Sequence, residues 1–236
     1  MLPRSAGPAG VICATADDLL GFARMHLTGG LAPDGTRVLS EAAAAAMTEQ
    51  QVELPDKYIL GDSWGLGWIR FGWDGHRLVG HDGNTIGQAA FLRVLPDAGL
   101  AVALLTNGGN THDLYVDLYR EIFDRVAGVA MPAPLAPPAE PPAVDTGRYV
   151  GVYERASSRM EFFEADGKLR LRDTVTGPIA ELVPETTHEF DLVPVDDGLF
   201  VVRPPGSESW MPVTFYTLPT GEPYVHMGVR ATPKVS

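Results

Sequence analysis

The sequence has very little cysteine and no long apolar run, and these absences exclude several kinds of protein. Cys13 is the only cysteine in 236 residues, so neither an internal disulfide framework nor a cysteine-based zinc site is expected. No stretch of about 18 apolar residues occurs, so no membrane span is expected. The first residues lack the apolar core of a signal peptide, which as written predicts a soluble, cytoplasmic protein.

Positive charge is also scarce. Lys and Arg together number 18 against 30 Asp and Glu, which gives a formal net charge of −12. Nucleic-acid binding needs a basic face, and no Lys/Arg cluster occurs. The histidines are mostly scattered singly, without the spacing of metal ligands. We therefore expect no nucleic-acid partner, no metal and no cofactor.

Proline, by contrast, is concentrated in one segment. "MPAPLAPPAEPPAV", residues 131–144, contains six prolines, which favour an extended, semi-rigid spacer. The segment separates a mixed α/β part from a part with almost no helical periodicity. The sequence therefore predicts an α+β domain over 1–130, a linker over 131–144 and an all-β domain over 145–236.

The first part carries clear helix and hairpin signals. Thr15 and Ser40 are N-cap residues for helices to about Leu27 and Thr48, and Asn110 or Thr111 begins a third that Gly128 ends. "WIRFGW", the turn "DG" and "HRLVGHDG" predict a hairpin, and "QAAFLRVL" and "LAVALLTN" predict two more strands. We expect a three- or four-stranded antiparallel sheet with helices against it.

The second part consists of short strands. "KLRLR" alternates strictly, and "ADGK", "DDG" and "PTGE" are turn signals. About eight candidate strands at roughly ten-residue spacing predict a small antiparallel barrel, lipocalin-like in its strand number.

Several motifs in a fixed order carry a family resemblance over about residues 5 to 128. "PAG…TADDLLGFARMHL", "WGLGW" and "GHDGNTIGQAAFLRVLPDAGLAVALLTN" resemble the serine β-lactamase, penicillin-binding protein and class C esterase superfamily. The match is closest to the class C-like branch that includes D-aminopeptidases and esterases. The segment after the linker is similar to the β-barrel domain that often follows such enzymes. The resemblance implies part of a β-lactamase/transpeptidase-like fold.

The resemblance also implies a site. In that family a serine of a Ser-x-x-Lys pair attacks an acyl carbon, a Tyr-x-Asn/Ser loop helps move its proton, and two backbone N–H groups bind the oxyanion. His81, Asp82 and Gly83 fill the Lys/His-x-Gly motif, and Asn84 would offer its backbone N–H. Three residues are expected to bind substrate: Asp82 along the rim of the cleft, Gly83 by letting a substrate lie against the strand, and Trp64 at the border of the cleft. Because His81 replaces the lysine of true β-lactamases, the motif suits esterase or peptidase relatives better.

The other two motifs are missing from the sequence. No serine is followed by lysine three residues on, and no tyrosine by Asn or Ser two residues on. The sequence therefore resembles the C-terminal half of a serine hydrolase, and we expect it to be inactive alone. Its substrate, once the site is completed, would be a small acyl compound: a β-lactam, an ester or a D-amino peptide.

Two other functions stay open. "GDSWG" matches the Gly-x-Ser-x-Gly elbow and would make Ser63 an esterase nucleophile, but that elbow needs a strand before the serine and a helix after it. The chain could also be a non-catalytic pseudoenzyme whose barrel binds a ligand or partner. In the resembled fold, N-terminal strands pair with Leu100–Thr106, so we expect self-association or a complementary N-terminal polypeptide at that edge.

Overall fold

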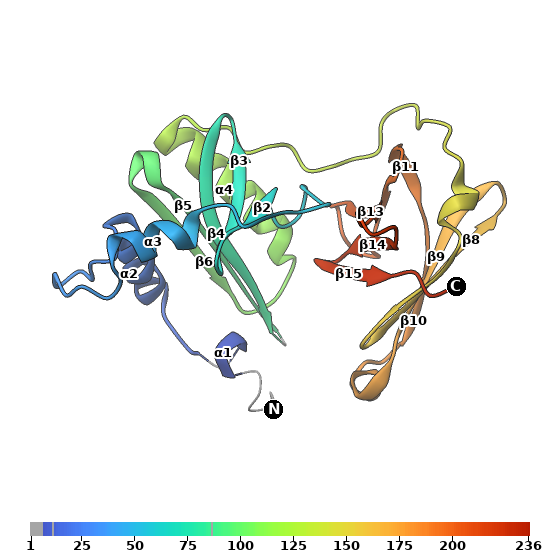
Figure 1. Ribbon diagram of the computed structural model, residues 1–236, viewed down its shortest axis with the longest axis horizontal. Coiled ribbons are helices and arrows are strands. Elements are labelled where there is room, and N and C mark those ends of the chain that lie inside the picture. The colour runs from blue at the N-terminus through green and yellow to red at the C-terminus, as the bar shows by residue number, and fades with distance from the viewer. Residues whose placement is uncertain (1–6, 11, 86) are drawn as a thin grey trace. The chain divides into compact units, whose positions relative to one another are not determined.

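The computed structural model describes residues 7–10, 12–85 and 87–236 (Figure 1). Its internal contacts divide the chain into two compact units, Met1–Ala133 and Pro134–Ser236. The boundary falls within the proline-rich segment, which contains no helix or strand between residues 131 and 144. Each unit has its own hydrophobic core.

The first unit has four described helices, and the last three begin and end at the residues that the sequence indicated. They are α1 (Gly7–Gly10), α2 (Ala16–Leu27), α3 (Glu41–Thr48) and α4 (Thr111–Ala127). Thr15 and Asp18 form a capping box, with each side chain accepting a hydrogen bond from the other residue's backbone N–H. Ser40 Oγ accepts from the N–H of Ala43 at 3.1 Å. Gly128 ends α4 in the left-handed conformation, at φ 65°.

The strands of the first unit form one antiparallel sheet of six, in the order β1-β2-β3-β4-β5-β6. They are β1 (Val52–Glu53), β2 (Ser63–Trp64), β3 (Ile69–Trp73), β4 (His76–Thr85), β5 (Gln88–Leu95) and β6 (Leu100–Thr106), with the 3-10 turn η2 (Pro96–Ala98) before β6. The expected three or four strands correspond to β3–β6. The two extra strands have two residues each, too short for a periodic signal.

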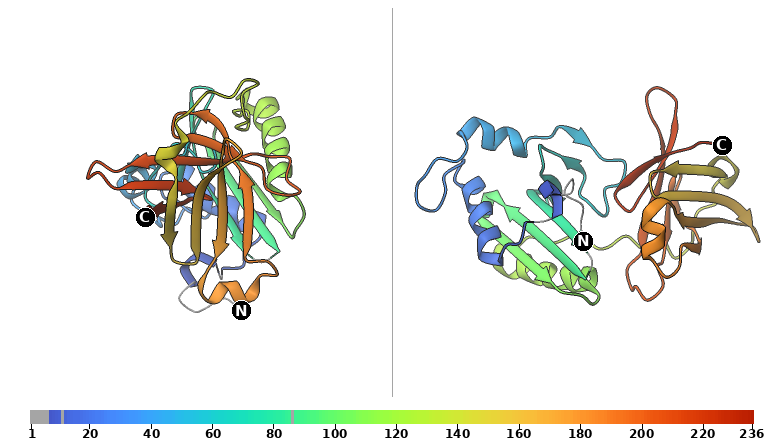
Figure 2. Two further views of the ribbon diagram at one scale, coloured as in Figure 1. Left: turned by 90° about the vertical axis from the view of Figure 1, so that its right-hand side faces the viewer. Right: turned by 90° about the horizontal axis from the view of Figure 1, so that it is seen from below.

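The sheet is covered on both faces (Figures 1 and 2). On one face, α4 packs through Tyr115, Tyr119 and Phe123 against side chains of β3–β5. On the other, Ala23 of α2 packs in a smaller cluster with Trp68 and with alternate residues of β4 and β5. Strands β4 and β5 therefore contribute apolar residues to both faces, as expected for a buried sheet centre.

The buried face of α4 differs from the apolar ridge that is most regular in the sequence. Leu114, Leu118, Ile122 and Val126 recur every four residues, but Leu114, Leu118 and Val126 are 50%, 36% and 66% exposed. The aromatic residues beside them pack on the sheet instead, because they bury more apolar surface per residue. The helix therefore presents an uncovered apolar ridge along its outer side.

The second unit is all-β apart from two 3-10 turns, η3 (Thr146–Tyr149) and η4 (Gly177–Leu182). One antiparallel sheet has the order β10-β9-β8-β7 and the other the order β11-β12-β13-β14-β15. The strands are β7 (Gly151–Arg155), β8 (Ser158–Ala165), β9 (Lys168–Val175), β10 (Thr187–Asp191), β11 (Val193–Asp196), β12 (Leu199–Val202), β13 (Met211–Thr217), β14 (Pro223–Met227) and β15 (Arg230–Pro233).

These strands correct the expected closed barrel of about eight strands. Nine strands divide into two sheets, and an isolated bridge between Tyr153 and Lys234 links β7 to the chain just after β15. At the opposite edges, β10 and β11 follow one another in sequence but belong to different sheets, so this described unit does not close. Aromatic and aliphatic side chains from both sheets fill the space between them, including Phe162, Phe200 and Phe215.

Candidate active site

Strand β4 extends beyond its neighbour on one side. It pairs with β3 from His76 to Gly80, whereas it pairs with β5 from Val79 to Thr85. From His81 to Thr85, then, β4 has a strand partner on the β5 side only, among the residues that the structure describes. The His-x-Gly motif lies on this half-paired segment.

The register shows which backbone groups point to the open side. Asp74 and Gly75 form a two-residue turn with φ of 48° and 79°, so the closing pair Trp73–His76 is hydrogen-bonded. Because hydrogen-bonded positions alternate along an antiparallel strand, His76, Leu78 and Gly80 direct their N–H and C=O groups toward β3. By the same alternation, the N–H and C=O of residues 82 and 84 point to the open edge. The backbone N–H of Asn84 is thus available for a ligand.

The imidazole of His81 is exposed and lies at the same segment. Its Nδ1 is 2.6 Å from the carbonyl oxygen of Asp82, and its ring lies edge-on to Trp64 with the ring centroids 5.6 Å apart. A carbonyl oxygen only accepts hydrogen bonds, so Nδ1 carries the proton of this bond and Nε2 takes no part in it. The structure thus brings together two predicted site residues, His81 and Trp64, from β4 and β2.

Gly83 leaves the surface of β4 bare. A Cβ at this position would meet only the Cβ of Ala90, at 3.9 Å, which is ordinary van der Waals contact. Packing inside the described chain therefore does not require a glycine here. The absence of a side chain leaves space against the strand, on the face to which His81 belongs.

Asp82 points to the opposite face of the sheet and binds a buried arginine. Arg93 Nη1 and Nη2 donate to its two carboxylate oxygens at 2.5 and 3.0 Å. The Arg93 side chain is 1% exposed and that of Asp82 is 20% exposed. The guanidinium lies over the rings of Phe71 and Tyr115, 3.9 and 4.9 Å from their centroids. Burial raises the pKa of Tyr115 to about 12, so this phenol is neutral near pH 7.

Arg93 was missed by the sequence reading. In "QAAFLRVL" it is one charge within an apolar strand, and nothing local shows that its side chain is covered. The signal that could have found it is the hairpin register, which pairs Arg93 with Gly80 and places it diagonally next to Asp82 on the same face.

Ser63 does not lie in a nucleophile elbow. It belongs to the two-residue strand β2, is 1% exposed, and leads through the turn after Trp64 into β3 rather than into a helix. Its hydroxyl donates to Asp62 Oδ1 at 2.6 Å, and Arg70 Nε donates to Ser63 Oγ at 3.3 Å. The strand-to-helix turn that would expose a serine for attack is not formed here.

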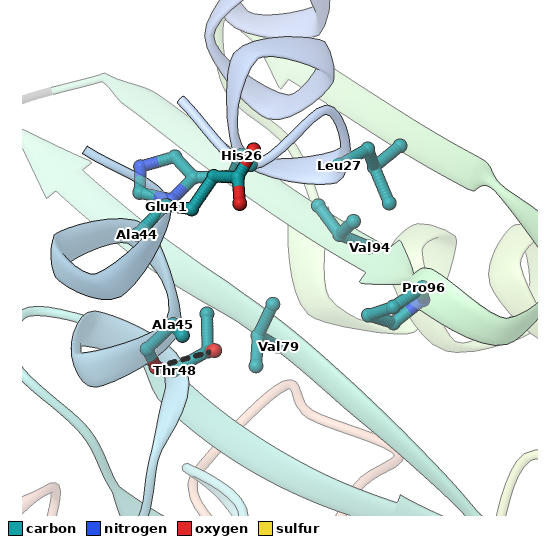
Figure 3. A pocket seen from close by; sticks show the side chains of 10 residues that line it. His26, Leu27, Glu41, Ala44, Ala45, Thr48, Val79, Val94 and Pro96 are labelled. Atoms are coloured by element: carbon teal, nitrogen blue, oxygen red, sulfur yellow. Dashed lines mark hydrogen bonds between the residues drawn. The ribbon is translucent and has the colours of Figure 1, made fainter. Parts of the chain in front are cut away.

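A separate cavity of about 230 Å³ lies between α2, α3, β4 and β5 (Figure 3). Its lining includes His26, Glu41, Thr48 and Val94, and none of the predicted site residues. Both ring nitrogens of His26 are buried without a hydrogen-bond partner in the described chain, and burial lowers the pKa of this histidine. The Thr48 hydroxyl is satisfied, because it donates to the carbonyl of Ala45. The cavity is mainly apolar.

No helix among the described residues is both long enough and apolar enough to cross a lipid bilayer. No group of three or more His, Cys, Asp or Glu side chains within 7–10, 12–85 and 87–236 is arranged to hold a metal ion.

Comparison with known proteins identifies the family. The family described as Beta-lactamase matches residues 1–127, more than half of the chain. The chain therefore belongs to the β-lactamase family of serine hydrolases. It is 51% identical over 156 residues to penicillin-binding protein 4 of Amycolatopsis lactamdurans, and the match covers 66% of this chain and 41% of that protein. It is 30% identical over 187 residues to human putative beta-lactamase-like 1, and the match covers 75% of this chain and 34% of that protein.

A solved structure is similar over nearly the whole chain. The crystal structure of SurE with D-Leu has a TM-score of 0.68 and 28% sequence identity, and the match covers 94% of this chain and 50% of SurE. This similarity extends over both units and supports the α+β fold. The chain spans about two fifths of the length of the penicillin-binding protein, and half of SurE.

Proposed function

We propose that this chain supplies one wall of a serine acyl-hydrolase active site, at the open edge of β4. The observation that carries the proposal is the half-paired segment from His81 to Thr85, where the Asn84 N–H points away from β5. A backbone N–H in such a place is a suitable donor for the oxyanion of a tetrahedral intermediate. His81 and Trp64 flank the segment, and Gly83 gives an acyl substrate access to the strand.

The identity of residue 81 favours one group of substrates. A lysine in this motif offers a fixed positive charge for the carboxylate of a β-lactam, whereas His81 offers an imidazole whose Nδ1–H is already bonded to a carbonyl. We therefore favour an ester or a peptide with a D-configured residue over a β-lactam. The solved structure of SurE with D-Leu supports the D-configured choice.

The nucleophile is proposed to come from outside these residues. The sequence contains neither Ser-x-x-Lys nor Tyr-x-Asn/Ser, so His81 and the Asn84 N–H have no attacking group to serve within it. Loss of nucleophile and base leaves only about 10³–10⁴-fold residual catalysis over water from the oxyanion hole and binding in such enzymes. We propose that turnover requires a polypeptide that carries both missing motifs.

Two exposed apolar features support a protein partner of that kind. Strand β6 is the last strand of the described sheet, and its Leu105 is 41% exposed. The outer ridge of α4 is likewise apolar and uncovered, with Val126 66% exposed. An unpaired edge and an apolar ridge are surfaces that a complementary polypeptide would cover. Self-association through β6 is the alternative outcome.

The test is reconstitution. The purified chain is mixed with a separately produced fragment of a family member that carries both Ser-x-x-Lys and Tyr-x-Asn/Ser. Turnover is measured on p-nitrophenyl acetate, a D-alanyl anilide and a chromogenic cephalosporin. We expect none from the chain alone, and activity on the ester and the anilide after mixing. Activity of the chain alone that is lost in Ser63→Ala would instead make Ser63 the nucleophile.

A matched pair of variants tests the oxyanion role in the mixture. Asn84→Pro removes the backbone N–H, and because this N–H is not part of the β4–β5 ladder, the strand should tolerate proline. We expect kcat to fall by about 10²–10³-fold, the usual cost of losing one oxyanion donor. Asn84→Ala keeps the N–H and should retain activity. Equal loss in both variants would contradict the assignment, and no activity in any mixture would favour the non-catalytic alternative.

A further inference from the structure

The half-paired segment of β4 has one strong attachment besides β5. Beyond Gly80, strand β3 no longer holds it, but the Asp82 carboxylate is bound by both terminal nitrogens of Arg93. A bidentate arginine–carboxylate pair fixes position and orientation as well as distance. Asp82 lies between His81 and Gly83, so this attachment holds the middle of the proposed site.

The arginine is itself held rigidly. It is among the largest fully buried side chains of the described protein. Phe71 and Tyr115 lie against its guanidinium, and Nη1 also donates to the carbonyl of Leu92 at 2.9 Å. Few other rotamers are open to a side chain enclosed in this way. Any displacement of Asp82 would therefore have to break this ion pair or move the core of the sheet.

Gly80 is part of the same arrangement. A Cβ on Gly80 would overlap the carbonyl oxygen of Leu92 and would lie 3.0 Å from Cδ of Arg93. The arginine side chain crosses β4 at the point where a glycine removes the obstacle. Gly80, Asp82 and Arg93 thus form one arrangement. The missing side chain of Gly80 leaves room for the arginine side chain, and the Asp82 carboxylate binds its guanidinium.

Stability alone does not account for this arrangement of Gly80, Asp82 and Arg93. A buried ion pair loses much of its Coulombic gain to desolvation, and a well-packed apolar replacement is often at least as stable. Here the balance is poorer still, because Arg93 Nε is buried without a hydrogen-bond partner in the described chain. What an apolar side chain could not do is fix the Asp82 carboxylate.

We infer that Arg93 is a positioning residue, which acts through Asp82 to hold the His81–Asn84 segment in the geometry that an oxyanion site needs. The role in catalysis rests on the proposed function, but the mechanical part does not. Without the anchor, the segment should retain its β5 pairing and lose its fixed orientation. Because the ring of His81 bonds to the carbonyl of Asp82, its position should change as well.

Amide hydrogen exchange tests the mechanical part on the chain as it is. By the register, the N–H groups of Val79, Gly83 and Thr85 all point toward β5, but only Val79 lies where β3 also pairs. In Arg93→Met we expect exchange at Gly83 and Thr85 to rise at least about tenfold more than at Val79, because local opening no longer breaks the ion pair. The ¹⁵N signals of the His81 ring should also move.

The matched control is Tyr119→Phe. It removes a buried hydroxyl that donates to the carbonyls of Phe91 and Val102 in the same core but does not touch Asp82. This variant should change exchange at Val79 and Gly83 alike and leave the His81 ring signals in place. Equal changes at Val79 and Gly83 in Arg93→Met, or the same ring shifts in Tyr119→Phe, would overturn the inference.

Two more variants cover the case in which Arg93→Met does not fold. Arg93→Lys keeps the positive charge but loses the planar guanidinium that binds both carboxylate oxygens. Asp82→Asn keeps the shape of the side chain but loses its negative charge. Both should show the Gly83 effect in weaker form, and its absence in both would also overturn the inference. In the reconstituted mixture, Arg93→Lys should lower kcat with KM unchanged. Local loosening without any activity in the wild-type mixture would refute the proposed function and leave the anchor standing.

Discussion

The two units are both antiparallel, but they place their charges differently. In the first unit a guanidinium is fully buried under the sheet, and the buried charged residues of the described chain, Asp56 and Arg93, both belong to it. In the second unit the core is aromatic and aliphatic. Several of its arginines instead form cross-strand ion pairs at the surface, such as Arg172 with Glu161 and Glu189. The second unit shows that this chain builds sheets without a buried charge, so the one in the first unit calls for a local explanation.

The largest effect should come from opening a cavity in the apolar core. Leu171 is 0% exposed at the centre of β9. Leu171→Ala should lower the free energy of unfolding of the second unit by about 2–5 kcal/mol, the sum of lost transfer energy and cavity cost. Urea titration followed by amide exchange in each unit measures it. Ile179→Ala, at a residue 48% exposed, is the control and should change little. Equal loss of protection in the first unit would show that the two units unfold together.

The buried charge should come next, and it tests the comparison directly. Arg93→Met leaves the Asp82 carboxylate without its partner, and we expect a loss of about 3 kcal/mol, at the lower end for broken buried pairs because Asp82 keeps 20% exposure. Arg172→Met removes an arginine that has two carboxylate partners at the surface. It should shift the urea midpoint of unfolding of the second unit by no more than the experimental error. Similar losses in both variants would remove the distinction between the two units.

The smallest effect is a difference in the response to acid. Burial lowers the pKa of His26 below its ordinary 6.5, so its contribution is present above pH 6.5 and is lost as the pH falls through the folded pKa. Burial raises the pKa of Asp173 above its ordinary 3.8, so its contribution is present below pH 3.8 and is lost as the pH rises through the folded pKa. Acidification should therefore weaken the first unit through His26 and strengthen the second through Asp173.

Urea midpoints of each unit at several pH values from neutral to mildly acidic measure these slopes. His26→Gln should flatten the acid loss of the first unit, and Asp173→Asn should flatten the gain of the second. An acid slope in the first unit that is unchanged in His26→Gln would assign it to other groups, of which His112 is one, since burial also lowers its pKa.

Local signals in the sequence predicted the elements well. Thr15, Ser40 and Gly128 act on backbone groups within a few residues, so their helix boundaries could be read directly. The Asp74-Gly75 turn likewise defined its hairpin. Closure of the second unit depends on whether β10 pairs with β11, which turns and alternation do not determine. The expected barrel was wrong for that reason.

The site was predictable only in part, for a similar reason. The family motif pointed to residues 81–84, and the structure places His81 beside Trp64 on an open strand edge. Their roles in catalysis stay predictions. The sequence assigned Asp82 to the substrate, whereas the structure shows it bound to Arg93. That contact depends on cross-strand register and on burial from α4, and neither is visible in the residues around Asp82.

The same register limits how the β4–β5 hairpin can vary in length. Thr85 and Gln88 face each other as its last pair, and Arg93 reaches Asp82 because the side chains alternate from that pair onward. One residue inserted or deleted between Thr85 and Gln88 would turn Leu92 or Val94 toward Asp82 and send the arginine to the face of α2. The contact between Asp82 and Arg93 therefore depends on the exact number of residues between strands β4 and β5. A Gly-x-Asp followed by an arginine eleven residues after the aspartate is a spacing by which other chains with this anchor can be searched.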